Sequence, residues 1–249
     1  MSLHPVDGIL FDIDDTLVDT RGAFAVALAA IARRYLPGVQ PDRDADLVTF
    51  WRADVNEHFA RYTRGEVGHV EQRMSRANEL HDEFGGPALD DAGFAAWDAV
   101  FDSSFREAWS AHEDVDEVLG RLLDAGLHVG ALTNASLAYQ SDKLERTGLA
   151  ERVPLLVGVD TLGFGKPDPR VFVEACRRLG TVPARTAYVG DELDVDARAA
   201  VAAGLVGIWL DRPGARRLPV LPEHLDAARQ AGVQIIPSLA ALPGLLGLN

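Results

Sequence analysis

Three aspartates follow a short apolar segment near the start of the chain. Residues 6–11 are mostly apolar and predict a buried strand, and Asp12, Asp14 and Asp15 come directly after it. Side chains alternate along a strand, so we expect Asp12 and Asp14 on one side and Asp15 on the other. Carboxylates this close repel one another, and burial adds to the cost of their charge. The pattern therefore indicates a positive partner, and oxygen ligands favour Mg²⁺.

A second group of acids lies in the segment GDELDVD, again directly after a predicted strand. Its members are Asp191, Asp194 and Asp196. Either group alone also fits helix caps or solvated turn acids, because short motifs match by chance. Two acidic groups at the ends of different strands favour a functional site. We expect Asp194 to face solvent.

Two further strand ends carry polar groups suited to an anion. In VGALTNAS, Thr133 and Asn134 can hold phosphate oxygens, although both types are also ordinary helix caps. In GFGKPDP, Lys166 lies in a turn where a lysine is usually solvated, yet its charge could hold phosphate beside crowded carboxylates. The turn is not a Walker A motif, because Asp160 replaces the required glycine and Pro167 follows the lysine.

The elements that carry these residues alternate between strands and helices. Such alternation predicts an α/β fold with a Rossmann-like parallel sheet covered by helices on both faces. Ligands bind at the carboxyl ends of the strands in sheets of this kind. Strands are expected at 6–11, 128–132, 155–157, 186–189 and 206–210, and helices at 115–124, 136–147, 168–179 and 193–203.

A helical insertion interrupts this alternation. Four apolar stripes with helical spacing predict a four-helix domain over residues 18–111, inserted into a catalytic core formed by residues 1–17 and 112–249. Because the insertion begins just after the first acids, we expect it to cover them like a lid. Its candidates for substrate selection are Arg64, His69 and Arg73, each of which could equally be a solvated helix charge. The stripes lie at 24–35, 47–62, 70–84 and 94–105.

Composition excludes several classes of function. A formal net charge of −14 and a pI near 4.8 argue against a nucleic-acid partner. The single cysteine suits a reducing compartment, and the sequence shows neither a signal-peptide pattern nor an apolar segment of membrane-spanning length. We therefore expect a cytoplasmic protein that does not bind membranes. Its oligomeric state cannot be predicted, because any apolar patch could be internal.

The motifs resemble those of the haloacid dehalogenase-like hydrolases. Asp-x-Asp-x-Thr in DIDDT, Thr in LTN, Lys in GKPDP and Gly-Asp-x-x-x-x-Asp in GDELDVD occur in that family's order. The helical insertion resembles the family's C1-type cap. This resemblance implies that Asp12 is a nucleophile and Asp14 a general acid and base. It also implies that Thr133 and Lys166 bind phosphoryl oxygens, and that Mg²⁺ is held by Asp12, the Asp14 carbonyl and Asp191, supported by Asp196.

The resemblance implies a Mg²⁺-dependent phosphatase acting on a small phosphorylated metabolite, such as a sugar phosphate or nucleoside monophosphate. Dehalogenating members lack the acid at the position of Asp14, because a halide leaves without a proton. A phosphonate hydrolase needs a lysine in the cap, and residues 18–111 contain none. A phosphomutase on the same scaffold stays open as the alternative. A phospho-acceptor signalling domain is less favoured, because it has no use for a large helical lid.

Overall fold

The computed structural model describes residues 5–216 and 219–248. The chain forms two compact units. One contains the residues up to Asp19 and from Ser110 onward, and the other contains Thr20–Trp109. Within the described residues, no helix is long and apolar enough to cross a membrane.

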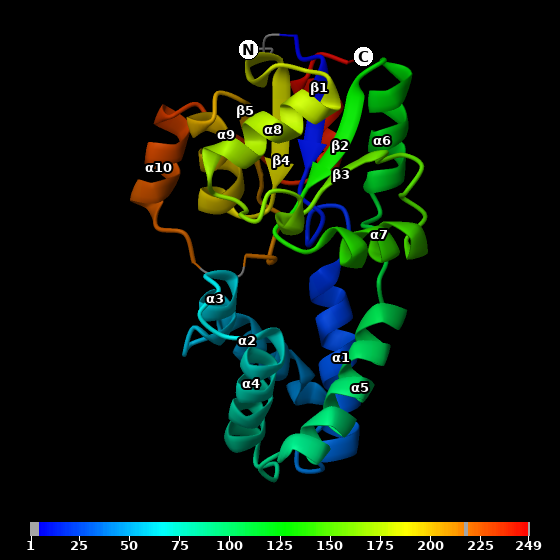
Figure 1. The fold of residues 1–249 in the computed structure, drawn as a ribbon, viewed down its shortest axis with the longest axis vertical. Helices are drawn as coiled ribbons and strands as arrows, with labels where there is room; N and C mark the ends of the chain where they lie inside the picture. Colours follow the sequence, from blue (N-terminus) through cyan, green and yellow to red (C-terminus); the bar gives the residue numbers. More distant parts are fainter. Residues whose placement is uncertain (1–4, 217–218, 249) are drawn as a thin grey trace. The chain divides into compact units, whose positions relative to one another are not determined.

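The first unit is built on a six-stranded sheet, drawn as arrows in Figure 1. All its strands pair in parallel, in the order β3-β2-β1-β4-β5-β6. Every residue of β1 is buried, so helices must cover both faces of the sheet centre. This confirms the predicted Rossmann-like α/β fold. The strands are β1 (Gly8–Phe11), β2 (His128–Leu132), β3 (Leu155–Val157), β4 (Thr186–Gly190), β5 (Val206–Leu210) and β6 (Gln234–Ile236).

The register brings the polar residues to one edge of the sheet. Phe11, the last residue of β1, lies opposite Ala131 of β2 and Val189 of β4. The chain therefore leaves all three strands at nearly the same level. The backbone N–H of Asp12 donates to the carbonyl of Val189 over 2.8 Å, which extends the β1–β4 pairing by one residue.

Helices and short turns connect the strands of this unit. Helix α8 packs against β1, β2 and β3, and its apolar side contacts Leu10 and Tyr188 in one buried cluster. Asp168 accepts a hydrogen bond from the Arg170 N–H and so caps α8, and Pro169 occupies the first turn, which agrees with the helix predicted from residue 168. The helices are α6 (Val115–Asp124), α7 (Leu137–Arg146), α8 (Pro169–Leu179), α9 (Ala199–Ala202), α10 (Pro222–Gln230) and α11 (Leu242–Leu245).

The second unit is entirely helical but has five helices where four were predicted. The stripe over 47–62 divides because Asp54 and Glu57 adopt left-handed backbone angles, with φ of 45° and 56°. The Asp54 carboxylate then accepts hydrogen bonds from the N–H groups of Phe59 and Ala60, which begins a new helix. The helices are α1 (Thr20–Tyr35), α2 (Asp44–Ala53), α3 (His58–Thr63), α4 (His69–Phe84) and α5 (Asp91–Glu107).

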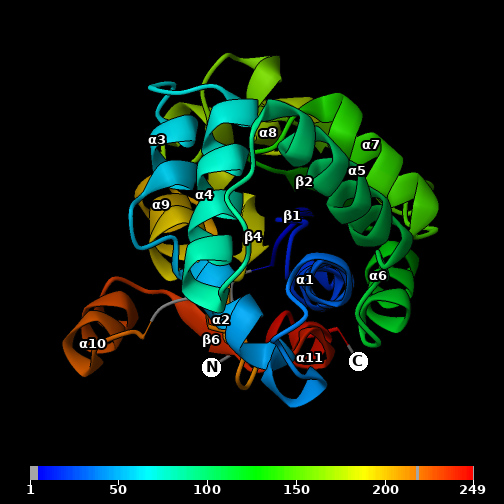
Figure 2. The same ribbon diagram turned by 90° about the horizontal axis from the view of Figure 1, so that it is seen from below.

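Aromatic side chains four residues apart form the core of the helical unit. Trp97, Phe101 and Phe105 stack along α5, with ring centroids 5.2 and 5.8 Å apart. Phe24 of α1 contacts Phe105 at 4.6 Å, and the two helices lie side by side in both views (Figure 1 and Figure 2). The spacing that predicted the 94–105 stripe is thus the spacing that fills this core.

Candidate active site

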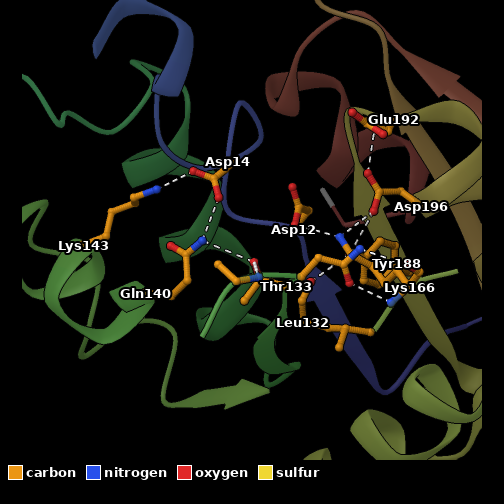
Figure 3. Close-up of polar contacts among 12 residues, drawn as sticks. Asp12, Asp14, Leu132, Thr133, Gln140, Lys143, Lys166, Tyr188, Glu192 and Asp196 are labelled. Carbon is orange, nitrogen blue, oxygen red and sulfur yellow. Dashed lines mark hydrogen bonds and ion pairs between the residues drawn. The ribbon is translucent and has the colours of Figure 1, made fainter. Parts of the chain in front are cut away.

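Asp12 lies at the carboxyl end of β1 and is almost fully buried (Figure 3). One of its oxygens, Oδ1, accepts a hydrogen bond from the Lys166 ammonium over 2.8 Å. Burial raises the pKa of Asp12, the charge of Lys166 lowers it, and the nearby carboxylates of Asp196 and Asp14 raise it again, giving a value of about 7. Asp12 is therefore an acid in a strongly negative, poorly hydrated environment, with one fixed cation beside it.

Lys166 joins three side chains at this point. Its ammonium donates to Asp12 at 2.8 Å, to Asp196 at 2.7 Å and to the Tyr188 hydroxyl at 2.8 Å. The Tyr188 hydroxyl in turn donates to the Leu132 carbonyl over 2.9 Å. Burial alone would lower the pKa of Lys166, but the charges of Asp12 and Asp196 raise it well above its usual value. The lysine is thus a permanently charged, fully coordinated cation, and Tyr188 is a partner that sequence reasoning missed.

Asn134 positions the turn that carries Lys166. Its side-chain amide donates to the Lys166 carbonyl over 2.8 Å and accepts from the Lys166 N–H over 2.7 Å. Gly165 makes this approach possible, because a Cβ there would lie 2.3 Å from the Asn134 Oδ1. Asn134 was predicted to bind phosphate, and its side chain is engaged with the main chain of Lys166.

The second acidic segment forms a single π-helical turn, Leu193–Arg198. This wide turn directs Asp196 inward, where it accepts from Lys166 and from the Glu192 N–H over 2.9 Å. Gly190 leaves the space, since a Cβ there would lie 2.3 Å from the Asp196 carboxyl carbon. Asp194 on the same turn is exposed and pairs with Arg198 at 2.7 Å.

Three carboxyl groups converge beside Lys166. Asp12, Asp191 and Asp196 each offer an oxygen, and these oxygens lie within 4.8 Å of one another. The pKa of Asp191 is raised well above its usual value by burial and then by four neighbouring carboxyl groups. Trp209 donates its indole N–H to the Asp191 carbonyl over 2.8 Å and so fixes the main chain. Lys166 is a single positive charge beside these three carboxyl groups, and a cluster of hard oxygen donors of this kind is the donor set that a divalent cation fits.

Asp14 faces a different part of the unit. Its Oδ2 accepts from the Gln140 amide over 2.7 Å, and its Oδ1 pairs with the Lys143 ammonium. The same Gln140 amide donates to the Thr133 hydroxyl oxygen over 3.2 Å. This hydroxyl oxygen also accepts a hydrogen bond from the Ala135 N–H. Figure 3 shows this second group beside the first, with Asp14 turned toward α7 and Asp12 toward Lys166. Thr133 and Asp14 are therefore connected through one α7 side chain.

Sequence reasoning missed Gln140 and Lys143, although the composition held a signal. The chain has only two lysines, Lys143 and Lys166, and its other 22 basic residues are arginine. Both lysines are buried, and both contact an aspartate of the first motif.

The chain matches the family described as haloacid dehalogenase-like hydrolase over residues 6–204. It belongs to that family. Among curated proteins, it is 30% identical over 209 residues to the glyceraldehyde 3-phosphate phosphatase of Methanopyrus kandleri, covering 83% of this chain and 84% of that protein. It is 32% identical over 206 residues to the ribulose-1,5-bisphosphate 5-phosphatase of Halopiger xanaduensis, covering 82% and 84%.

The fold is also similar to solved structures of the family. The HAD hydrolase YfnB from Bacillus subtilis, determined with bound magnesium, matches with a TM-score of 0.74 and 22% identity, covering 98% of this chain and 99% of that one. This likeness extends over both units of the chain and describes the fold alone.

In this haloacid dehalogenase-like hydrolase, the three candidates for substrate selection all lie in the helical unit. Arg64 is exposed and pairs with Glu66. Arg73 pairs with Asp98 at 3.2 Å and is largely buried against the aromatic core. His69 lies one turn before Arg73 on α4, and its pKa is lowered by burial and by the charge of Arg73. Arg73 and His69 are therefore neighbours on one helix, whereas Arg64 belongs to a surface ion pair.

Proposed function

We propose that the protein is a Mg²⁺-dependent phosphatase that hydrolyses a small phosphorylated metabolite through an aspartyl-phosphate. One observation carries the proposal: Asp12 is a buried carboxylate held by Lys166 beside the acid cluster with Asp191 and Asp196. Asp14 supplies a second, partly exposed carboxyl group two residues later. A fixed nucleophile, a fixed cation and a separate proton carrier are the parts that phosphoryl transfer requires.

In the first step, an oxygen of Asp12 attacks the phosphorus and the bond to the ester oxygen breaks. Lys166 fixes the attacking carboxylate through Oδ1, and in this proposal the Thr133 hydroxyl and the charge of Lys166 stabilise the phosphoryl oxygens. A Mg²⁺ ion held by Asp12, the Asp14 carbonyl and Asp191 would neutralise negative charge on the transferred group. Asp196 accepts hydrogen bonds from Lys166 and from the Glu192 N–H, and so helps to hold Lys166 in position.

In the second step, water attacks the phosphorus of the aspartyl-phosphate and the phosphorus–oxygen bond to Asp12 breaks, which releases inorganic phosphate and restores the Asp12 carboxylate. Asp14 takes the proton of the water, after having given its own proton to the leaving oxygen in the first step. This pair of proton transfers favours an ester substrate, because a halide leaving group needs no proton. The phosphatase relatives support the same assignment.

The substrate class that we propose is a phosphorylated small metabolite of the sugar-phosphate type. The two phosphatase relatives described above act, by name, on a phosphorylated triose and a phosphorylated pentulose. The helical unit would select the leaving group, with Arg73 and His69 as its candidates and Arg64 as a weaker one. We further propose a cytoplasmic location, consistent with the absence of a membrane-spanning helix among the described residues.

The test is phosphate release from a panel of phosphorylated metabolites, measured with Mg²⁺ or with EDTA. Wild type and Asp12→Asn are compared with Asp194→Asn, a matched control that changes an exposed acid of the second motif. We expect turnover that needs Mg²⁺, is lost in Asp12→Asn and persists in Asp194→Asn. A wild type that releases phosphate from no ester would contradict the proposal. Transfer of phosphate between positions of a sugar without its release would indicate a phosphomutase.

A further inference from the structure

Lysine is almost absent from this chain, and its two lysines lie at the same end of one sheet. Lys166 follows the motif pattern, but Lys143 lies on α7 and belongs to none of the motifs. Apart from histidine, every other basic residue of the chain is arginine. Lysine presents one compact ammonium on a flexible stem, whereas arginine presents a planar fork of donors. Both lysines of the chain are thus buried ammonium groups that pair with a carboxylate of the first motif.

The burial of Lys143 needs a partner, and the partner is Asp14. Only 1% of the Lys143 side chain is exposed, whereas 38% of the Asp14 side chain is exposed. A buried ammonium is expensive unless it is paired and hydrogen-bonded. The pair thus links a buried side chain of α7 to a carboxylate that is partly exposed to solvent.

Gln140 adds a second, directional contact one turn earlier on α7. It is fully buried, and its amide nitrogen donates to both Asp14 Oδ2 and Thr133 Oγ1. Its amide oxygen has no hydrogen-bond partner among the described residues. The hydrogen bonds of the Gln140 side chain are therefore those that its amide nitrogen donates to Asp14 and Thr133. Both oxygens of Asp14 are therefore held from α7, and the same helix touches the candidate phosphate-binding hydroxyl.

We propose that Lys143 and Gln140 are positioning residues that orient the Asp14 carboxyl group for its two proton transfers. This inference rests on the proposed phosphatase function. In the first transfer, the phosphorus–oxygen bond to the leaving group breaks as Asp14 gives that oxygen its proton, which yields an alcohol and the Asp14 carboxylate. In the second, water bonds to phosphorus, its proton goes to Asp14 and the bond to Asp12 breaks, which yields inorganic phosphate. Both α7 residues act through the Asp14 carboxyl group and neither gives nor takes a proton in these steps.

The proposal makes the effect of each variant depend on the leaving group. An alkyl phosphate needs a proton on its leaving oxygen, whereas p-nitrophenyl phosphate releases a stable phenolate without one. Removing the Lys143 charge should therefore slow formation of the aspartyl-phosphate only for the alkyl ester. Its breakdown needs a base for either substrate and should slow for both.

The experiment compares wild type with Lys143→Met and Gln140→Leu on p-nitrophenyl phosphate and on the best alkyl phosphate of the panel. For Lys143→Met we expect kcat/KM to fall about 100-fold with the alkyl ester and less than about fivefold with the aryl ester. With the aryl ester, kcat should fall and a burst of nitrophenolate should precede steady turnover. Gln140→Leu should show the same pattern with a smaller loss. Lys143→Arg, which keeps the charge, should recover at least about tenfold of the alkyl-ester loss.

Leu144→Ala is the control for a purely structural effect, because Leu144 is a buried neighbour of Lys143 on α7. It should lower thermal stability without changing the ratio of alkyl to aryl activity. The inference would be overturned if Lys143→Met lost kcat/KM equally on both esters. It would also be overturned if kcat/KM for the alkyl ester were unchanged or higher. A wild type that hydrolyses neither ester would instead contradict the proposed function itself, so the two failures are distinguishable.

Discussion

The two lysines of this protein hold their carboxylates in different ways. Lys166 is surrounded by Asp12, Asp196 and Tyr188, whose side chains are nearly inaccessible to solvent. Lys143 is equally buried, but its partner Asp14 is more than a third exposed. The first arrangement holds Asp12, the proposed nucleophile, in a buried network. The second holds Asp14, the proposed proton carrier, through a buried lysine and leaves its carboxylate partly exposed to solvent.

The largest loss of unfolding free energy should come from removing the Lys166 charge, because its partners are the most buried. Lys166→Met leaves the charges of Asp12 and Asp196 unpaired in the interior, and breaking a buried pair in this way costs about 3–5 kcal/mol of unfolding free energy. Lys143→Met should cost less, because solvent can hydrate Asp14. Urea unfolding of both variants in EDTA measures the difference. Equal losses would show that exposure of the partner does not distinguish the two sites.

Asp191→Asn should not lower the unfolding free energy of the metal-free protein, in contrast to the two lysine variants. Burial and neighbouring carboxyl groups raise the pKa of Asp191, so removing its charge relieves repulsion and should leave the metal-free stability equal or higher by about 1 kcal/mol. Wild type should gain thermal stability when Mg²⁺ is added, and the variant should not. Thermal unfolding with and without Mg²⁺ tests both statements. A clear destabilisation of the variant in EDTA would contradict this account of the cluster.

An ion pair outside both lysine clusters provides a structural comparison. Arg212 donates to both oxygens of Asp114 at 2.9 and 2.8 Å, and Ser238 donates to the same carboxylate. Burial alone would raise the pKa of Asp114, but these hydrogen bonds outweigh it and lower the pKa to about 2. A lowered folded-state pKa means that the stabilisation is present above pH 4 and is lost as pH falls toward 2.

This pair should therefore contribute roughly 2 kcal/mol at neutral pH, with no contribution to catalysis. Asp114→Asn should remove that part of the acid dependence between pH 4 and 2 and leave kcat unchanged at neutral pH. Unfolding free energies measured across this range, with the same enzyme assayed at pH 7, test the statement. An unaltered acid dependence in the variant would be evidence against it.

The smallest change in thermal stability should come from a substitution on the surface of the helical unit. Arg64 and Glu66 are both exposed, so water already solvates their charges and the pair adds little. Arg64→Gln should leave the melting temperature unchanged within experimental error. Thermal unfolding beside Arg73→Gln, which removes a largely buried guanidinium from Asp98, provides the contrast. A loss in Arg64→Gln as large as that in Arg73→Gln would show that the Arg64 pair is more than a surface contact.

The sequence predicted what depends on local pattern. Strand alternation and motif order gave the sheet and placed Asp12, Lys166 and Asp191 at its carboxyl edge, because parallel strands end together. It did not predict Tyr188, whose hydroxyl lies within an apolar strand, or Lys143, whose partner is 129 residues away. Helical periodicity identifies a buried position but not the group that it meets. The break at Asp54 was missed because a left-handed aspartate does not interrupt an apolar stripe.

The central claim is that Asp12 carries the phosphoryl group during turnover. It is tested most directly by mixing the Mg²⁺-loaded enzyme with p-nitrophenyl phosphate, quenching in acid within milliseconds and locating the modified peptide by mass spectrometry. Lys143→Met is the best protein for this trap, because its intermediate should accumulate. We predict one phosphoryl group on the peptide that contains Asp12, absent in Asp12→Asn. Phosphate release with no phosphoryl group on Asp12, or with one on another residue, would contradict the account.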